Sequence, residues 1–381
     1  MKFRVVPFFI IVLSAMPGFA IDQVFLEPTQ PISPALKAQG GASTANAQGF
    51  DALFVNPAAF ADPQINLTFL SLEGTAQSSL TGLRKILEVR DAMGNPLANP
   101  FLSTLNDVVA HGGLGGEGSV RAGWVGANLG AGLTVQSRMA FSGPNLLDSK
   151  TLFDQTTMGV VGMGWPFDVG MGTLKLGADI RPMQRAYSTI SFGTLKDNLA
   201  NLSAYKIQSG FGLALDFGAR WDYADFKTGL VIRDVGSTII GFKEYSGTQW
   251  ASGLSFPSGG STAGSTLYRI PMVVGLGTNW TPDMGSLGPL FQPSLSFDLQ
   301  IPIKDELTEP SFWTWTHLGA EAKFLQFLAV RAGMNQGYFT FGLGAKVYIF
   351  DFNLAVYTDE MGRYSGTLPR PAISMELAFR L

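Results

Sequence analysis

The chain has 381 residues, no cysteine and a formal net charge of −3 at pH 7. The lack of cysteine excludes disulfide bonds and thiolate chemistry, and so mild a negative charge gives no reason to expect a nucleic-acid partner. Charged residues make up 14% of the chain, compared with about 25% in a typical soluble protein, and glycine supplies 46 residues. The chain is therefore poor in surface charge and rich in glycine.

Residues 1–20 are predicted to be a secretory signal peptide. Lys2 and Arg4 form a positive start, Val5 to Leu13 form an apolar core, and Gly18-Phe19-Ala20 is a small-x-small cleavage site. The alternative, an N-terminal membrane anchor, would need about 20 apolar residues, and this core is shorter. We therefore expect the mature protein to be exported.

Residues 21–62 are predicted to form a compact plug. The segment is rich in small residues such as Gly40-Gly41, which let backbones approach closely, and Asn56-Pro57 is a turn signal with a fixed φ at the proline. Phe50, Phe54 and Phe60 add bulky apolar side chains to this small-residue background. We expect the segment to fit inside a structure that the rest of the chain forms.

The next part of the chain changes from a strand to a helical pattern. Residues 66–73 are predicted to be a first strand, and residues 82–110 two short amphipathic helices, with Asn99-Pro100 suited to a helix start. The helical insertion has two interpretations, a surface excursion that merely covers an opening or an extracellular cap that receives an apolar ligand. The sequence does not separate them.

From Ser119 onward the sequence alternates between apolar and polar residues. Clear examples lie at 174–181, 211–222, 291–301 and 317–324. Each run has about 9 to 11 residues, the length that crosses a bilayer when a strand is tilted. One face is apolar and the other carries glycine, polar groups and charges, which is typical of a transmembrane β-barrel. A large secreted soluble β-protein is the alternative, but its polar faces are rarely so rich in glycine.

We therefore predict an all-β, antiparallel transmembrane barrel over residues 63–381, with about 12 to 14 strands by count of the runs. Five tryptophans fall near predicted strand ends, where interfacial aromatic girdles lie: Trp124, Trp165, Trp221, Trp280 and Trp313. The longest break, residues 237–268, is predicted to be an ordered extracellular loop. Ile373–Leu381 alternates to the end, as expected for a strand that closes the barrel on the first strand.

Both ends of the sequence resemble one family. The Gly-Gly-Ala run at 40–42, followed by Asp51-Ala52-x-Phe54-x-Asn56-Pro57-Ala58, is similar to the N-terminal hatch of the outer-membrane long-chain fatty-acid transporter superfamily of FadL type. The segments Gly342–Lys346 and Phe352–Tyr357 are similar to its closing strands. The resemblance implies fourteen strands, a hatch inside the lumen and a multi-pass location in the bacterial outer membrane.

The same resemblance implies a function and a route. A long-chain fatty acid or other hydrophobic compound is captured by extracellular loops and passed to a lumenal pocket. A shift of the hatch at Phe54 and Asn56-Pro57-Ala58 then opens an exit through the barrel wall. The terminal strand resembles the recognition signal of the barrel-assembly machinery, although it ends in Leu381 rather than the more common phenylalanine.

Charged residues on the predicted lumenal faces have two interpretations. They either pair across the lumen and hold the plug, or one arginine or lysine binds a fatty-acid carboxylate while apolar residues enclose the tail. For the second interpretation our candidate ligand-binding residues are Arg181, Arg220, Phe50 and Phe60.

An enzyme is not expected, because two histidines, His111 and His317, and no cysteine leave few members for a catalytic relay or a metal site. No cofactor is predicted. Barrels that shuttle cargo for type IX secretion have similar ends, so a cargo-binding protein of that kind stays open as the alternative function. A general porin is disfavoured, because the hatch should occlude the lumen.

Overall fold

The computed structural model describes residues 30–79, 82, 84, 99–110, 113–145, 147–191, 205–252, 260, 261, 266–303, 312–360, 366 and 369–381. The predicted signal peptide, most of the first predicted helix and His111 lie outside these residues. Among the described residues, no helix combines the length and the apolar character needed to cross a membrane.

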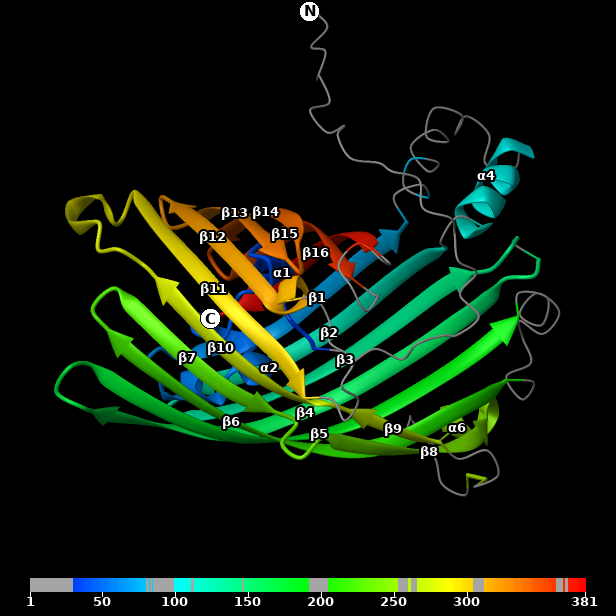
Figure 1. The fold of residues 1–381 in the computed structure, drawn as a ribbon, viewed down its shortest axis with the longest axis horizontal. Coiled ribbons are helices and arrows are strands. Elements are labelled where there is room, and N and C mark those ends of the chain that lie inside the picture. The colour runs from blue at the N-terminus through cyan, green and yellow to red at the C-terminus, as the bar shows by residue number, and fades with distance from the viewer. Residues whose placement is uncertain are drawn as a thin grey trace, which may run out of the picture.

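The described strands close into an antiparallel barrel of 14 strands with two extra strand segments (Figure 1), which confirms the predicted fold class. β1 pairs with both β2 and β16, and β5 pairs with β6, so the ring has no open edge there. The strands are β1 (Asn66–Ser78), β2 (Leu114–Gly126), β3 (Leu129–Ser142), β4 (Lys150–Asp168), β5 (Thr173–Ser191), β6 (Lys206–Tyr223), β7 (Phe226–Arg233), β8 (Thr238–Ser246), β9 (Leu267–Ile270), β10 (Met272–Trp280), β11 (Phe291–Ile303), β12 (Thr316–Phe324), β13 (Leu328–Asn335), β14 (Tyr338–Val347), β15 (Phe350–Glu360) and β16 (Pro369–Arg380).

The two faces of the wall differ as the alternation predicted. On β6, Phe211, Leu213 and Leu215 point outward and are exposed, whereas Ala214 and Asp216 face the interior and are buried. Apolar outward faces have no interior to pack against, so they suit contact with lipid, while the polar inward faces need partners inside the barrel.

The wall is interrupted at residues 234–237. β7 and β8 both pair with β6, but the β6–β7 ladder ends at Phe217↔Ile232 and the β6–β8 ladder begins at Phe211↔Gly241. The chain therefore places extra residues opposite the segment 212–216 of β6. Among these extra residues, Asp234, Gly236 and Ser237 have positive φ. β9 and β10 are interrupted at the same level, around Pro271. This is a bulge of several residues in one strand line of the barrel.

The predicted loop at 237–268 was wrong in its first part. Residues 238–246 form β8, and Gly247–Ser252 form the short helix α6. The strand was missed because apolar residues occupy both of its faces: Ile240 and Phe242 are buried, while Ile239 is exposed. Alternation between apolar and polar residues is then lost, although the strand itself is regular.

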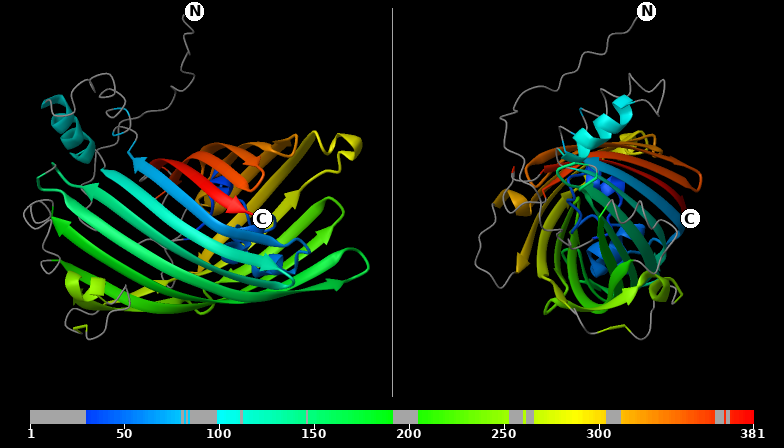
Figure 2. Two further views of the ribbon diagram at one scale, coloured as in Figure 1. Left: turned by 180° about the vertical axis from the view of Figure 1, so that it is seen from behind. Right: turned by 90° about the vertical axis from the view of Figure 1, so that its right-hand side faces the viewer.

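The segment 30–62, here called the hatch, lies inside the barrel (Figure 2). It contains α1 (Pro34–Ala38), η1 (Gly49–Asp51), α2 (Ala52–Val55) and η2 (Pro57–Ala61). α1 begins with proline in its first turn, and the Ser33 hydroxyl accepts a hydrogen bond from the Leu36 amide. Most hatch residues are buried, so the hatch shares a core with the wall instead of forming a separate domain.

Two ends of the barrel can be distinguished. Short turns at 127–128, 169–172, 224–225, 325–327 and 348–349 join strands at one end. At the other end lie α4 (Asn99–Ala110) and α6 (Figure 1). Val108 and Val109 of α4 are buried, so this helix of the predicted insertion packs onto the protein. Three-residue and four-residue 3-10 turns, η4 (Gly285–Leu287) and η5 (Phe312–Trp315), complete the described helices.

Candidate functional site

The Asn-Pro-Ala sequence lies where two turns of the hatch meet. The Asn56 side chain donates from Nδ2 to the Thr44 backbone oxygen at 2.8 Å, and its Oδ1 accepts from the Ala58 amide at 3.0 Å. Pro57 then begins η2. The wall beside it must be glycine, because a Cβ atom on Gly177 would overlap the backbone of Pro57. Close contact between hatch and wall is thus one reason for the high glycine content.

The three hatch phenylalanines are fully buried between hatch and wall. Phe50 and Phe54 pack with ring centroids 5.4 Å apart, and Phe60 lies against Gly130 and Gly162 of β3 and β4. They belong to one core cluster together with Met158 and Met183 of the wall. Phe50 and Phe60 were predicted to contact a ligand. They pack between the hatch and the wall instead, and they do not line the cavity described below.

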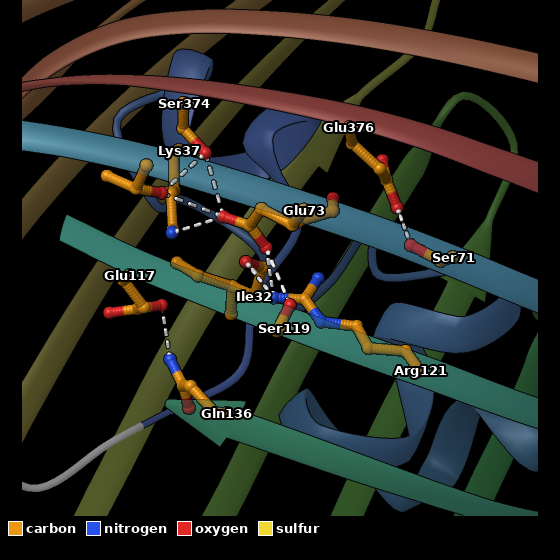
Figure 3. A network of polar contacts seen from close by, with 12 residues as sticks. Ile32, Lys37, Ser71, Glu73, Glu117, Ser119, Arg121, Gln136, Ser374 and Glu376 are labelled. Atoms are coloured by element: carbon orange, nitrogen blue, oxygen red, sulfur yellow. Dashed lines mark hydrogen bonds and ion pairs between the residues drawn. The ribbon is translucent and has the colours of Figure 1, made fainter. Parts of the chain in front are cut away.

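A buried polar network ties α1 to the wall (Figure 3). Glu73 of β1 accepts from Lys37 Nζ at 2.7 Å, from Ser374 at 2.7 Å and from Arg121 of β2. Arg121 also reaches the Ile32 carbonyl at 3.4 Å. Burial lowers the pKa of Lys37, but attraction to Glu73, together with smaller contributions from Tyr357 and Glu117, leaves the pKa well above its ordinary value. Lys37 therefore stays charged and holds α1 to the wall.

Side chains of strands β11 and β12 hold the hatch turn at residues 40–46. The amides of Ser43 and Thr44 donate to the same Asp298 oxygen at 2.8 and 2.7 Å. Nδ1 of His317 lies 2.8 Å from the Gly40 oxygen. Asp298 and His317 are direct partners across β11 and β12. These contacts support the first interpretation of the lumenal charges, in which they hold the plug.

The end of the hatch is clamped by basic side chains. Asp62 accepts from Lys175 Nζ at 2.7 Å and from the Arg220 guanidinium group. Arg220 also pairs with Asp222 at 2.8 Å and is only 2% exposed. The structure therefore places Arg220, one predicted ligand-binding residue, in an ion-pair cluster near the short turns and away from the cavity.

A cavity of about 240 Å³ lies between the start of the hatch and the interrupted wall. Its lining combines aliphatic and thioether side chains with three arginines and few other polar groups. The lining residues are Gln30, Thr156, Met158, Arg181, Met183, Arg185, Arg233, Asp234, Ile240, Ile270, Pro271, Val273 and Pro302. Both interruptions of the wall, at Asp234 and at Pro271, border this cavity. Arg181, the other predicted ligand-binding arginine, lines it.

The three arginines of the cavity differ in their partners. Arg181 pairs with Asp216 at 3.2 Å and with Asp234 at 3.0 Å. Arg185 pairs with Asp154 through two nitrogens, at 2.5 and 3.0 Å. Arg233 instead donates to the neutral Gln300 at 2.9 Å.

Arg233 is therefore the cavity arginine whose guanidinium group is the best candidate to bind a ligand. Among the residues that the structure describes, it makes no ion pair within 4.0 Å, and it is 7% exposed. Its sequence pattern does not distinguish it from the other lumenal charges. Its position as the last residue of β7, directly before the wall breaks, is visible only in the structure. Within the described ranges, no cluster of three or more His, Cys, Asp or Glu side chains could hold a metal ion.

No protein-family model matches the sequence. No curated protein sequence matches it either. Solved structures do match the fold. The chain is similar to a deltaS2 mutant of the TodX monoaromatic hydrocarbon channel, with a TM-score of 0.51 and 12% identity over 92% of this chain and 98% of that chain. It is similar to the P. putida toluene transporter TodX, with a TM-score of 0.50 and 12% identity over the same shares of the two chains.

A Pseudomonas aeruginosa FadL homologue gives a TM-score of 0.47, with 13% identity over 93% of this chain and 98% of that chain. The two TodX likenesses show that this chain has the fold of those channels, a barrel of the kind that the hatch motif and the closing strands predicted.

Proposed function

We propose that the protein is a transporter of hydrophobic compounds in the bacterial outer membrane, with long-chain fatty acids as its substrates. The observation that carries this proposal is the cavity between hatch and wall, which is lined by apolar side chains and by Arg233. The shared fold with channels named for toluene and monoaromatic hydrocarbons supports the hydrophobic part of the proposal.

The cavity suits one end of an amphiphile. A cavity of about 150 Å³ accommodates benzene, so 240 Å³ accommodates a ring or a segment of an alkyl chain. Met158 and Met183 are flexible enough to adapt to either. Arg233 offers the donors that a carboxylate binds, in a fork geometry. A long alkyl chain extends beyond this volume, so binding requires the hatch or the wall to move.

The proposed route follows the interruption of the wall. A shift of the hatch around Asn56-Pro57-Ala58 frees the compound to leave the cavity, and the exit lies beside residues 234–237. Few backbone hydrogen bonds hold the wall there; one runs from the Val235 amide to the Leu215 oxygen at 3.0 Å. Leu213 and Ile239 on the outer surface next to the break are exposed. Transport in this scheme is driven by the concentration gradient and by consumption of the compound downstream.

Equilibrium binding of a fluorescent long-chain fatty acid to the detergent-purified protein tests the proposal. We expect saturable binding that toluene displaces, and a Kd about tenfold higher for Arg233→Gln, since a charge-assisted hydrogen bond contributes roughly 1.5–3 kcal/mol. Lys243→Gln is the matched control, because it removes the same charge from an exposed position on β8.

The other outcomes separate the alternatives. Binding that Met158→Trp weakens but Arg233→Gln does not would keep the hydrophobic transporter and exclude the carboxylate contact. If folded protein bound neither the fatty acid nor toluene, the transporter would be contradicted and the cargo-shuttling barrel of type IX secretion favoured.

A further inference from the structure

The short turns of the barrel differ in chemistry, and exposed apolar side chains occur at several of them, including Val169 and Met171 in the turn 169–172. The turn Ala224-Asp225 between β6 and β7 and the turn Tyr348-Ile349 between β14 and β15 both have two residues. In both, the first residue has a positive φ, 47° for Ala224 and 55° for Tyr348. The geometry is the same, but one turn carries a methyl group and a carboxylate, and the other carries two large apolar side chains.

Tyrosine is energetically unfavourable at a turn position with a positive φ. A bulky side chain with positive φ is rare, and glycine, asparagine or aspartate normally fills it. Tyr348 is nevertheless 92% exposed, so no contact within the protein compensates for the strain. The neighbouring turn 325–327 repeats the pattern, because Leu325 has a φ of 52° and is 53% exposed.

The two turns form one continuous apolar surface. The Lys346 amide donates to the Phe327 oxygen at 2.7 Å, which joins the ends of the β12–β13 and β14–β15 hairpins. Phe324, Leu328, Val347 and Phe350, on the strands directly adjoining, are also exposed. The apolar outer face of β12–β15 therefore continues around the tips of the turns, with the exposed Gln326 as a polar side chain within it.

Strand length gives apolar tips a specific use on this side of the barrel. β12 has nine residues and β13 has eight. At about 3.3 Å per residue and a tilt of about 40°, nine residues span roughly 23 Å, slightly less than the apolar band of about 25 Å. β5 and β6 have 19 and 18 residues and exceed the band by far. On the short side the turns themselves must complete the band.

We propose that the turns 325–327 and 348–349 are a lipid-contact surface immersed in the membrane leaflet at the short-turn end, while the turn 224–225 lies in water. Phospholipid is the occupant because the surface is continuous with the lipid-facing wall. The inference rests on the proposed membrane location but not on any particular substrate.

Spin labelling tests this directly, because the chain has no cysteine of its own. Tyr348→Cys, Ala224→Cys and Leu343→Cys would each be labelled in protein reconstituted into phosphatidylethanolamine–phosphatidylglycerol vesicles. Collision rates with oxygen, which partitions into lipid, and with a water-soluble nickel chelate would then be measured. Leu343 lies outward in the middle of β14 and reports on the membrane itself.

We expect the labels at 348 and 343 to favour oxygen and the label at 224 to favour the nickel chelate. A label at 348 that favours the chelate while 343 favours oxygen would overturn the lipid contact and leave the membrane location intact. A label at 343 that favours the chelate would overturn the membrane location. Protection of 348 from both reagents would also overturn the proposal, because a protein would then cover the surface.

Discussion

Asn56 holds the turn that contains Thr44: its side-chain amide donates to the Thr44 backbone oxygen at 2.8 Å while accepting from the Ala58 amide at 3.0 Å. Thr44 in turn donates to Asp298 of the wall at 2.7 Å. One buried side chain thus joins the start of η2, the turn at 43–46 and, through that turn, the barrel. This chain of contacts gives the Asn-Pro-Ala sequence a physical role in positioning the hatch.

Replacing Asn56 by alanine should loosen the hatch without unfolding the barrel. The substitution leaves a buried carbonyl and a buried amide without partners, which costs about 1–3 kcal/mol. We expect amide hydrogens in residues 40–62 to exchange faster by about tenfold or more, while those of β14 and β15 keep their rates. Asn145→Ala is the control, since Asn145 donates to Asp148 in an exposed loop. Equal exchange in the two variants would contradict the role assigned to Asn56.

Adding a methyl group at Gly177 should displace the hatch. A Cβ atom there would overlap the backbone of Pro57, which cannot move aside as a flexible side chain could. Overpacking of this kind costs about 1–3 kcal/mol, so we expect Gly177→Ala to lower the urea midpoint and to raise ion conductance through reconstituted barrels. Gly74→Ala is the control, because no atom lies within 4 Å of a Cβ at that position. Conductance that is the same for both variants would show that the contact is not needed to seat the hatch.

Asp51 should make stability depend on pH. Burial raises the pKa of Asp51 above its ordinary value, and repulsion from Glu376 adds to the effect, although the hydrogen bond from Ser33 opposes it. Because the folded-state pKa exceeds the unfolded-state pKa, this contribution to stability is present at low pH and is lost as the pH rises through the folded-state value. Unfolding by urea should therefore show Asp51→Asn gaining stability relative to wild type as the pH rises above the ordinary aspartate pKa of about 4.

The same substitution at the exposed Asp148 is the control for that experiment. A difference between Asp51→Asn and wild type that stays constant over the pH range would contradict the assignment.

Asp62 and Arg220 should be energetically coupled. Arg220 is almost completely buried and Asp62 is largely buried, so loss of either removes one charge partner from the other. In a double-mutant cycle with Asp62→Asn and Arg220→Gln, we expect a coupling energy of about 0.5–3 kcal/mol in the free energy of unfolding. Additive effects of the two substitutions would show that the direct contact between Asp62 and Arg220 contributes nothing to stability.

The barrel could be predicted from the sequence because its signal is local. Along β6, the alternation of Phe211, Leu213 and Leu215 with Gly212 and Ala214 is visible within a few residues. The strand β8 could not be predicted from alternation, because Ile239 and Ile240 place apolar side chains on both of its faces. The wall break between β7 and β8 reflects a mismatch with β6, which no local pattern contains.

The candidate site was harder to predict because it depends on distant partners. Arg220 and Arg233 both follow alternating runs and both face the lumen. Arg220 is neutralised by Asp62, which lies 158 positions earlier in the chain. Arg233 lines the cavity, donates to the neutral Gln300 and, within the described part of the chain, forms no ion pair within 4.0 Å. Sequence alone gives the face of a strand but not the height in the barrel or the identity of the opposing side chain. The choice between these arginines therefore required the packed structure.

The most direct test of hatch-gated transport is fatty-acid uptake with the hatch tied to the wall. A Cβ atom added at Gly275 of β10 would lie 3.3 Å from Oγ1 of Thr44, so Thr44→Cys with Gly275→Cys places two sulfur atoms within reach of a disulfide bond. Cells producing this variant would be given a radiolabelled long-chain fatty acid before and after reduction. We predict little uptake in the oxidised form and recovery on reduction, whereas each single variant should give the same uptake before and after reduction. Equal uptake by the oxidised and reduced double variant would contradict the account.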